Sequence, residues 1–174
     1  DVQGIREHFL NIFVVDAFLG NPDRNNSNWG IILGVDGNKR IAPIYDNGNC
    51  LNCKWDEEKM SEVLSDEMEL ETESYRGRRC IFEMKGKKIN PYHLMENMEY
   101  RECSDAVERL IPIIGDLLPE IRRLIEDIPV ISEVQKMFYY KIMECRYDKE
   151  FLPIYQKIIA EKNIYETGGQ QNVQ

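Results

Sequence analysis

The beginning of the chain constrains the fold most, because a helical pattern gives way to a strand pattern after one short polar loop. From Gly4 to Leu19, apolar residues recur every three or four positions, which predicts a helix with one buried face. Gly20-Asn21-Pro22 ends this helix, since a residue that precedes proline avoids the helical conformation. Asparagines and charged residues then fill the loop as far as Asn28.

Two short strands follow this loop. Trp29–Leu33 and Lys39–Tyr45 are rich in apolar residues, and the Val35–Asn38 segment between them holds the Asp-Gly pair typical of hairpin turns. A second tight turn is predicted at Asp46-Asn47-Gly48-Asn49. Because hairpin strands run antiparallel, the second strand ends where the first began.

The rest of the chain is predicted to be mainly helical. We therefore expect an α+β, mainly α fold with a small antiparallel hairpin, in one domain of residues 1–174 whose last residues, 168–174, fray. The further predicted elements are a helix over Glu57–Leu64, a long loop over 67–88 with a hairpin at Phe82–Lys88, a helix from Asn90-Pro91 to Asn97, and helices over Asp105–Leu118 after an N-cap at Ser104, Glu120–Ile128 after Pro119, Ser132–Arg146 and Glu150–Lys162.

Composition limits the classes of partner. A net charge of −9 disfavours general binding to nucleic acid. No apolar run approaches the roughly 18 residues that a membrane span needs, and no signal peptide opens the chain, so we expect a cytoplasmic protein with no membrane partner. The five cysteines lack regular spacing, which suits reduced thiols, and Cys50-Leu-Asn-Cys53 lacks the second pair that a zinc site needs.

Charge is distributed unevenly over residues 56–88. Nine acidic residues lie between Asp56 and Tyr75, with Lys59 as the single basic residue among them. From Arg76 to Lys88 the chain carries six basic residues and Glu83. This pattern is typical of a solvated surface segment, and the alternative is a segment that contacts a charged partner.

Asp16 stands out within the first predicted helix. It follows Ile12 by four residues and Phe9 by seven, which places it on the apolar face. A buried carboxylate must be paired or hydrogen-bonded, so we expect Asp16 to bond backbone N–H groups of the loop that follows. The alternative is a helix that is rotated enough to expose Asp16 to water.

Three polar residues are ordered around the first hairpin. Asn28 precedes its first strand and Asp46 follows its second, so the two side chains converge at one end of the hairpin. Amide and carboxylate oxygens are hard donors suited to Mg²⁺. Asp23 lies on the same loop, on the helix side, where an unligated acid could accept a proton from a hydroxyl. The set therefore predicts phosphoryl-transfer chemistry.

The loop has two other possible interpretations. Asp23, Asn25 and Ser27 match the first ligands of a calcium-binding EF-hand loop, but position 6 is Asn28 and position 12 is Gly34 instead of glycine and glutamate. The pattern therefore fails as a calcium loop. A plain polar turn between helix and strand remains the alternative, since asparagine, aspartate and serine are common in turns.

The segments FLGNPDRNNSNWGIIL and IAPIYDNGNCL resemble the HipA and CtkA group of bacterial serine/threonine kinases. That group carries a pattern like G-N-x-D-R-H-x-x-N followed by P-x-Y-D. The resemblance extends over most of the chain as a kinase C-lobe, is motif-specific over about Phe18–Leu51, and includes the later stretch KGKKINPYHLMENM. The matching positions are Gly20, Asn21, Asp23, Arg24, Asn28, Pro43, Tyr45 and Asp46.

This resemblance implies roles for individual residues. Asp23 would be the catalytic base, and Asn28 and Asp46 would hold Mg²⁺ under the phosphates of ATP. Asn25 replaces the histidine that the group usually carries near the phosphates, and an amide can bond a phosphate oxygen but carries no charge. Residues 47–89 would be the activation segment, with Asn47-Gly48 in place of the usual Phe-Gly.

A kinase also needs a loop that covers the phosphates and a lysine–glutamate pair. The chain has neither a G-x-G-x-x-G nor a V-A-I-K motif, so we expect an N-terminal lobe upstream of Asp1 as a partner. By itself this lobe should transfer phosphate to its protein substrate poorly or not at all. The alternatives are a non-catalytic kinase-like module that binds through its acidic segment and, less favoured, a metal-dependent phosphohydrolase.

Overall fold

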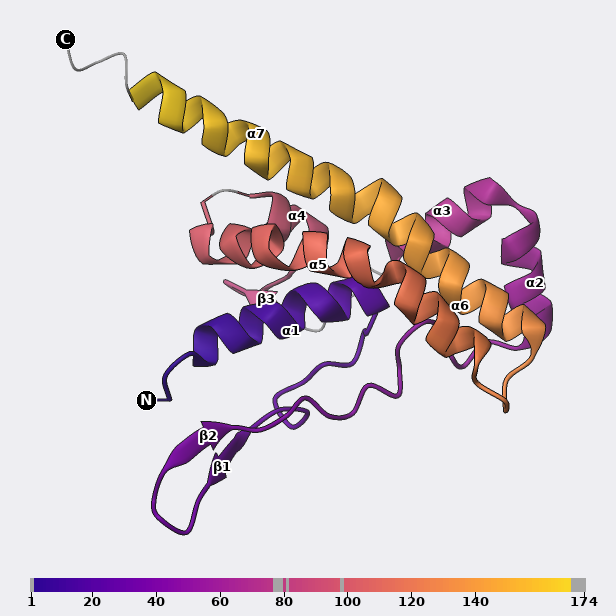
Figure 1. The fold of residues 1–174 in the computed structure, drawn as a ribbon, viewed down its shortest axis with the longest axis horizontal. Coiled ribbons are helices and arrows are strands. Elements are labelled where there is room, and N and C mark those ends of the chain that lie inside the picture. The colour runs from indigo at the N-terminus through magenta and orange to yellow at the C-terminus, as the bar shows by residue number, and fades with distance from the viewer. Residues whose placement is uncertain (1, 77–79, 81, 98, 170–174) are drawn as a thin grey trace.

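The computed structural model describes residues 2–76, 80, 82–97 and 99–169. Helices dominate it, and its two small sheets are two-stranded antiparallel hairpins. Helices α1, α4, α5 and α7 pack together, while α2 and α3 pack against α6 (Figure 1). The predicted α+β, mainly α class is confirmed. Among the described residues, no helix combines the length and apolar character required to cross a membrane.

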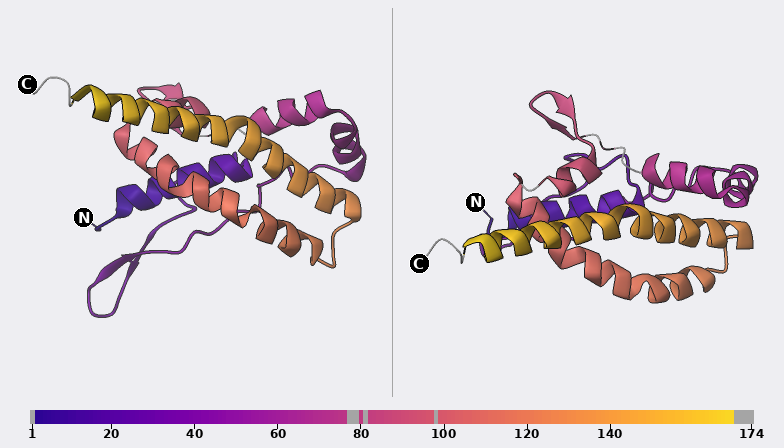
Figure 2. Two further views of the ribbon diagram at one scale, coloured as in Figure 1. Left: turned by 45° about the horizontal axis from the view of Figure 1, so that its top comes forward. Right: turned by 90° about the horizontal axis from the view of Figure 1, so that it is seen from above.

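The first helix and the first hairpin form as predicted. Helix α1 spans Ile5–Leu19, and strands β1 (Ile31–Leu33) and β2 (Lys39–Ile41) pair with Ile31 opposite Ile41 and Leu33 opposite Lys39. Both strands are shorter than predicted. The hairpin extends away from the helices, so its strands pair only with each other (Figures 1 and 2).

The acidic region contains two helices, of which the sequence predicted one. Helix α2 spans Glu57–Ser65 as expected, and Asp56 caps it by accepting a hydrogen bond from the N–H of Lys59. Helix α3 spans Glu67–Arg76, where a loop was predicted, and that prediction was wrong. Glutamate favours helices, and α3 gains its place by packing on α6, where Ser74 is fully buried.

The second hairpin and the helix after it agree with the prediction. Strands β3 (Glu83–Met84) and β4 (Lys87–Lys88) pair around a turn at Lys85-Gly86, and residues 77–79 and 81 of the predicted loop lie outside the described residues. Helix α4 spans Pro91–Glu96. The Asn90 side chain caps it by accepting a hydrogen bond from the N–H of Tyr92 at 3.0 Å.

One long helix replaces the two that were predicted in the middle of the chain. Helix α5 runs over Arg101–Glu126 through Pro112 and Pro119, so the predicted break at Pro119 and the N-cap at Ser104 were wrong. Ser104 lies inside the helix, fully buried. A proline removes one helical hydrogen bond and bends a helix without always ending it, and α5 is visibly bowed (Figure 2).

The C-terminal helices join into one rod. Helix α6 (Glu133–Arg146) begins with the predicted cap at Ser132, whose side chain and that of Gln135 form a capping box. A π-helical turn, η1 (Tyr147–Phe151), leads without a break into α7 (Leu152–Gly169), so the separate start at Glu150 was wrong. Residues 168 and 169 belong to α7, and the rest of the predicted frayed tail, 170–174, lies outside the described residues.

Two apolar clusters form the interior. The larger one joins α1, α4, α5, the end of α6, η1 and α7, and the smaller one joins α2 to α6. Fully buried members of the larger cluster are Val14, Met95, Ala106, Val107, Ile111, Phe151 and Ile158, and those of the smaller one are Met60, Val63, Phe138 and Ile142.

Arg146 is a buried cation at the junction of three helices. Its Nε donates to the backbone carbonyl of Ser74 at 3.0 Å, and its Nη1 donates to the backbone carbonyl of Phe18. Burial lowers the pKa of its guanidinium from the ordinary value. The side chain therefore fixes the last turn of α1, which leads into the polar loop, relative to α3 and α6.

Gly20 ends α1 with a left-handed backbone, φ 66°. We expect Gly20→Ala to lower the free energy of unfolding by roughly 1–2 kcal/mol through backbone strain. A further loss is expected because an added Cβ would lie 3.0 Å from Nη2 and 3.1 Å from Nη1 of Arg146. Urea denaturation measures the loss.

Gly37→Ala is the matched control for this prediction. Gly37 has φ 78°, and an added Cβ would meet no heavy atom within 4 Å. It should therefore lose no more than the backbone part. Equal losses in the two variants would contradict the proposed contact between position 20 and Arg146.

Candidate active site

A buried ion pair lies beneath the polar loop, which we define as residues 20–28. Asp16 on α1 is 7% exposed, and Arg24 in the loop is 2% exposed. Arg24 Nε donates to Asp16 Oδ2 at 2.7 Å and its Nη2 donates to Oδ1 at 3.0 Å. The predicted burial and pairing of Asp16 are confirmed. Its carboxylate bonds the side chains of Arg24 and Asn21, however, and not the backbone N–H groups that were expected.

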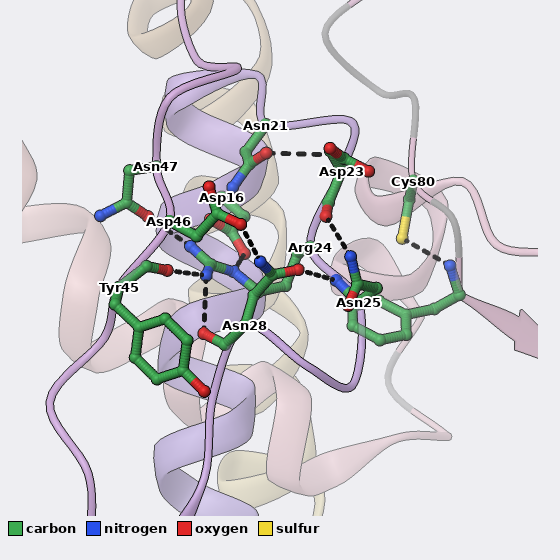
Figure 3. A network of polar contacts seen from close by, with 11 residues as sticks. Asp16, Asn21, Asp23, Arg24, Asn25, Asn28, Tyr45, Asp46, Asn47 and Cys80 are labelled. Carbon is green, nitrogen blue, oxygen red and sulfur yellow. Dashed lines mark hydrogen bonds and ion pairs between the residues drawn. The ribbon is translucent and has the colours of Figure 1, made fainter.

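The same guanidinium holds the segment that returns from the hairpin, which we call the return segment, residues 45–49. Arg24 Nη1 donates to the carbonyl oxygens of Asn28 at 3.1 Å and Tyr45 at 2.6 Å. Its Nη2 also donates to Asn47 Oδ1. Figure 3 shows Arg24 between the polar loop and the return segment. The hydrogen bond to Asp16 raises the pKa of Arg24, so the side chain stays charged.

Asn28 and Asp46 meet at the base of the hairpin, as the antiparallel geometry predicted. Asn28 is buried, and its Oδ1 accepts a hydrogen bond from the N–H of Asn25 at 3.0 Å. Its Nδ2 donates to Asp46 Oδ2 (Figure 3). Asp46 is exposed and has a left-handed backbone, φ 59°, which is uncommon outside glycine. Arg24 fixes Tyr45 and Asn47 on either side of it.

Asp23 is exposed on the same loop. Its N–H donates to Asn21 Oδ1 at 3.1 Å, and its Oδ2 accepts a hydrogen bond from Asn49 Nδ2 at 2.6 Å. Within the described part of the chain, no hydrogen bond joins the Asp23 carboxylate to Asn28 or Asp46. The loop therefore presents one acid apart from the Asn28–Asp46 pair.

Asn25 shapes the loop with its own side chain. Its Oδ1 accepts hydrogen bonds from the N–H and the hydroxyl of Ser27, and its Nδ2 donates to the carbonyl of Asp23 at 3.3 Å. These contacts hold the turn between Asp23 and Asn28. A role of Asn25 toward a nucleotide stays a prediction.

The donor set fits a hard divalent cation that keeps outer ligands. Asp46 offers an exposed carboxylate whose Oδ1 has no donor among the described residues. The Asn28 amide faces Asp46 with its Nδ2, while its Oδ1 accepts from the N–H of Asn25 and keeps one further lone pair, so the role of this oxygen as a metal ligand stays a prediction. In the described part of the chain, no group of three or more His, Cys, Asp or Glu side chains could form a protein cage for a metal. Water and phosphate oxygens would complete the ligand set, which is the usual mode for Mg²⁺.

The two cysteines after the return segment have different surroundings. Cys50 is buried, and burial raises the pKa of its thiol to about 11. Cys53 is exposed, and its Sγ donates to the carbonyl of Gly48 at 2.9 Å. The burial of Cys50 and the bond from Cys53 to Gly48 fix the turn that follows Asp46.

Sequence reasoning missed Asn49 and Asn47. The sequence places Asn47 in a tight turn and, by the resemblance, in place of the usual Phe of Phe-Gly, but it does not predict that the Asn47 side chain binds Arg24. Asn49 contacts Asp23 from a distant part of the sequence, and a turn motif carries no signal for such a pairing.

The chain is similar to known kinases in sequence and in structure. No family model matches the chain. The serine/threonine-protein kinase CtkA of Helicobacter pylori is 34% identical over 143 residues, which cover 81% of this chain and 43% of that protein. The crystal structure of the H. pylori proinflammatory kinase CtkA matches with a TM-score of 0.80 at 32% identity, over 89% of this chain and 54% of the other.

The fold and the structural match show that the chain has an α+β, kinase-like C-lobe. Within that class it is CtkA-like, in sequence over most of its length and in structure. The chain spans less than half the length of the curated relative and about half of the solved one.

Arg24→Met is expected to destabilise the protein by roughly 3–5 kcal/mol, because it leaves the buried Asp16 carboxylate without its cation. Denaturant unfolding of the two proteins measures the difference. Arg6→Met is the matched control, since Arg6 pairs with Glu102 on the surface, both side chains are mostly exposed, and its loss should change little. A loss no larger than that of the control would contradict the structural role of the ion pair.

Proposed function

We propose that this chain forms the catalytic lobe of an ATP- and Mg²⁺-dependent serine/threonine protein kinase. The observation that carries the proposal is the convergence of Asn28 and Asp46 at the base of the hairpin, with Asp23 exposed on the same loop. The likeness to the CtkA kinase supports it.

In this proposal Asp23 orients the hydroxyl of a serine or threonine side chain and accepts its proton. The hydroxyl oxygen forms a bond to the γ-phosphorus of ATP while the bond to the bridging oxygen of ADP breaks. Asn28 and Asp46 would hold Mg²⁺, which would neutralise the charge of the phosphates. Arg24, held by Asp16, fixes both ligand residues through its hydrogen bonds to the carbonyl of Asn28 and to that of Tyr45, which precedes Asp46.

The adenine and the outer phosphates require protein beyond these residues. Asp23, Asn28 and Asp46 supply a base and metal ligands, while a loop over the phosphates and a cationic side chain on them are also needed for transfer. We propose that an N-terminal lobe supplies both. Residues 1–174 alone should bind ATP weakly and transfer little phosphate.

The test uses the protein that carries this chain, expressed at the full length that its gene encodes, with γ-labelled ATP, Mg²⁺ and generic protein substrates. We expect label on serine or threonine, and its loss in Asp23→Asn and Asp46→Asn. Asp36→Asn in the exposed hairpin turn is the matched control and should keep the activity. Absence of both Mg²⁺–ATP binding and transfer would overturn the proposal and favour a non-catalytic binding module.

The metal role of Asn28 gives a separate prediction. Asn28→Ala should raise the Mg²⁺ concentration for half-maximal transfer by at least about tenfold, because one oxygen ligand is removed. Asn26→Ala is the control, since Asn26 is exposed in the same loop. The measurement is the transfer rate against Mg²⁺ concentration at fixed ATP. An unchanged Mg²⁺ requirement would assign Asn28 a purely structural role.

A further inference from the structure

Among the described residues, the Asp23 carboxylate receives a hydrogen bond from one protein donor, which comes from the return segment. Asn49 Nδ2 lies 2.6 Å from Asp23 Oδ2. The described residues offer no donor to Oδ1, so the carboxylate is held through one oxygen and open at the other. An exposed aspartate without such a contact would change rotamer readily.

The backbone that carries Asn49 is fixed on both sides. Before it, Asn47 Oδ1 is bound by Arg24. After it, the N–H of Leu51 donates to the carbonyl of Leu19 at 2.9 Å, which ties the turn to the end of α1. The Asn49 amide therefore reaches Asp23 from a backbone segment that is fixed on both sides. Its contact with Asp23 is thus determined by the fold.

Asp23 is itself fixed from the opposite direction. Its N–H donates to Asn21 Oδ1, and Asn21 Nδ2 donates to Asp16 Oδ1 at 3.0 Å. The backbone of Asp23 is thus tied to the buried ion pair, while its side chain is tied to the return segment. Asn21 and Asn49 together define both the position and the orientation of the carboxylate.

We propose that Asn49 is a positioning residue for Asp23: it binds Oδ2 and so directs Oδ1 toward the acceptor hydroxyl. The inference rests on the proposed kinase function. Asn49 also links Asp23 to Asp46, the residue that would hold the metal, because Asn49 and Asp46 belong to the same return segment.

The geometry predicts a specific kinetic effect. Asn49→Ala removes the donor and should lower kcat for peptide phosphorylation by roughly 10- to 100-fold, as small errors in the position of a reacting group do. The KM for Mg²⁺–ATP should stay unchanged, because Asn49 contacts neither Asn28 nor Asp46 in the described hydrogen bonds. The exposed pair adds little to stability, so the unfolding free energy should also stay unchanged.

Further variants separate positioning from packing. Asn49→Asp keeps the shape but replaces the donor by a second carboxylate, and it should lose at least as much kcat as Asn49→Ala. Asn49→Gln keeps the donor on a longer side chain and should restore part of the rate. Asn38→Ala is the matched control, because Asn38 Nδ2 donates to Asp36 Oδ2 at the same 2.6 Å in the hairpin turn.

The full-length protein is assayed for initial rates against peptide and against Mg²⁺–ATP. The proposal is supported if kcat falls in Asn49→Ala and Asn49→Asp and recovers in part in Asn49→Gln. The control Asn38→Ala should keep the kcat of the wild type. An active wild type whose kcat is unaffected by Asn49→Ala overturns this inference and leaves the kinase function standing. A wild type that neither binds Mg²⁺–ATP nor transfers phosphate overturns both.

Discussion

The buried Asp16–Arg24 ion pair is the interaction on which the candidate site depends. Two charges removed from water are costly unless each is paired and hydrogen-bonded. Here Asp16 receives two bonds from Arg24 and one from Asn21, and the remaining N–H groups of Arg24 bind carbonyl and amide oxygens. The oxygens belong to the polar loop and the return segment. One satisfied pair therefore sets the position of both segments on α1.

A second buried guanidinium, that of Arg146, fixes the C-terminal end of α1. Arg146 binds the carbonyl of Phe18, two residues before the polar loop begins, and that of Ser74 in the last turn of α3. Gly20 leaves the room that this side chain needs. The loop thus starts from a helix end that is fixed by α6 and continues over a base that is fixed by Arg24. This support helps to hold an exposed acid such as Asp23 in place.

Much of this could be predicted from the sequence, where the signal is local. The burial of Asp16, the hairpin and the meeting of Asn28 with Asp46 follow from periodicity and strand direction. Contacts between distant segments carry no such signal, which is why the Asn49–Asp23 bond was missed. Helix α3 was missed although its glutamates favour a helix, because its acidic composition was interpreted as a solvated loop. The continuity of α5 was missed because packing carries this helix past Ser104 and Pro119, two residues that often begin a helix.

The π-helical turn η1 constrains the number of residues between α6 and α7 more than it constrains which residues lie on its surface. Arg146 and Phe151 are five residues apart and both fully buried, although an α-helix would place them on different faces. The wider turn brings them to one side, so Arg146 reaches α1 while Phe151 enters the main core. Inserting one residue between them would rotate α7 by about 100° relative to α6, whereas deleting one would leave a four-residue spacing that an ordinary α-helical turn already places on one side. Insertions in η1 should therefore disrupt the packing of α7, while a single deletion converts the π-helical turn into an α-helical one.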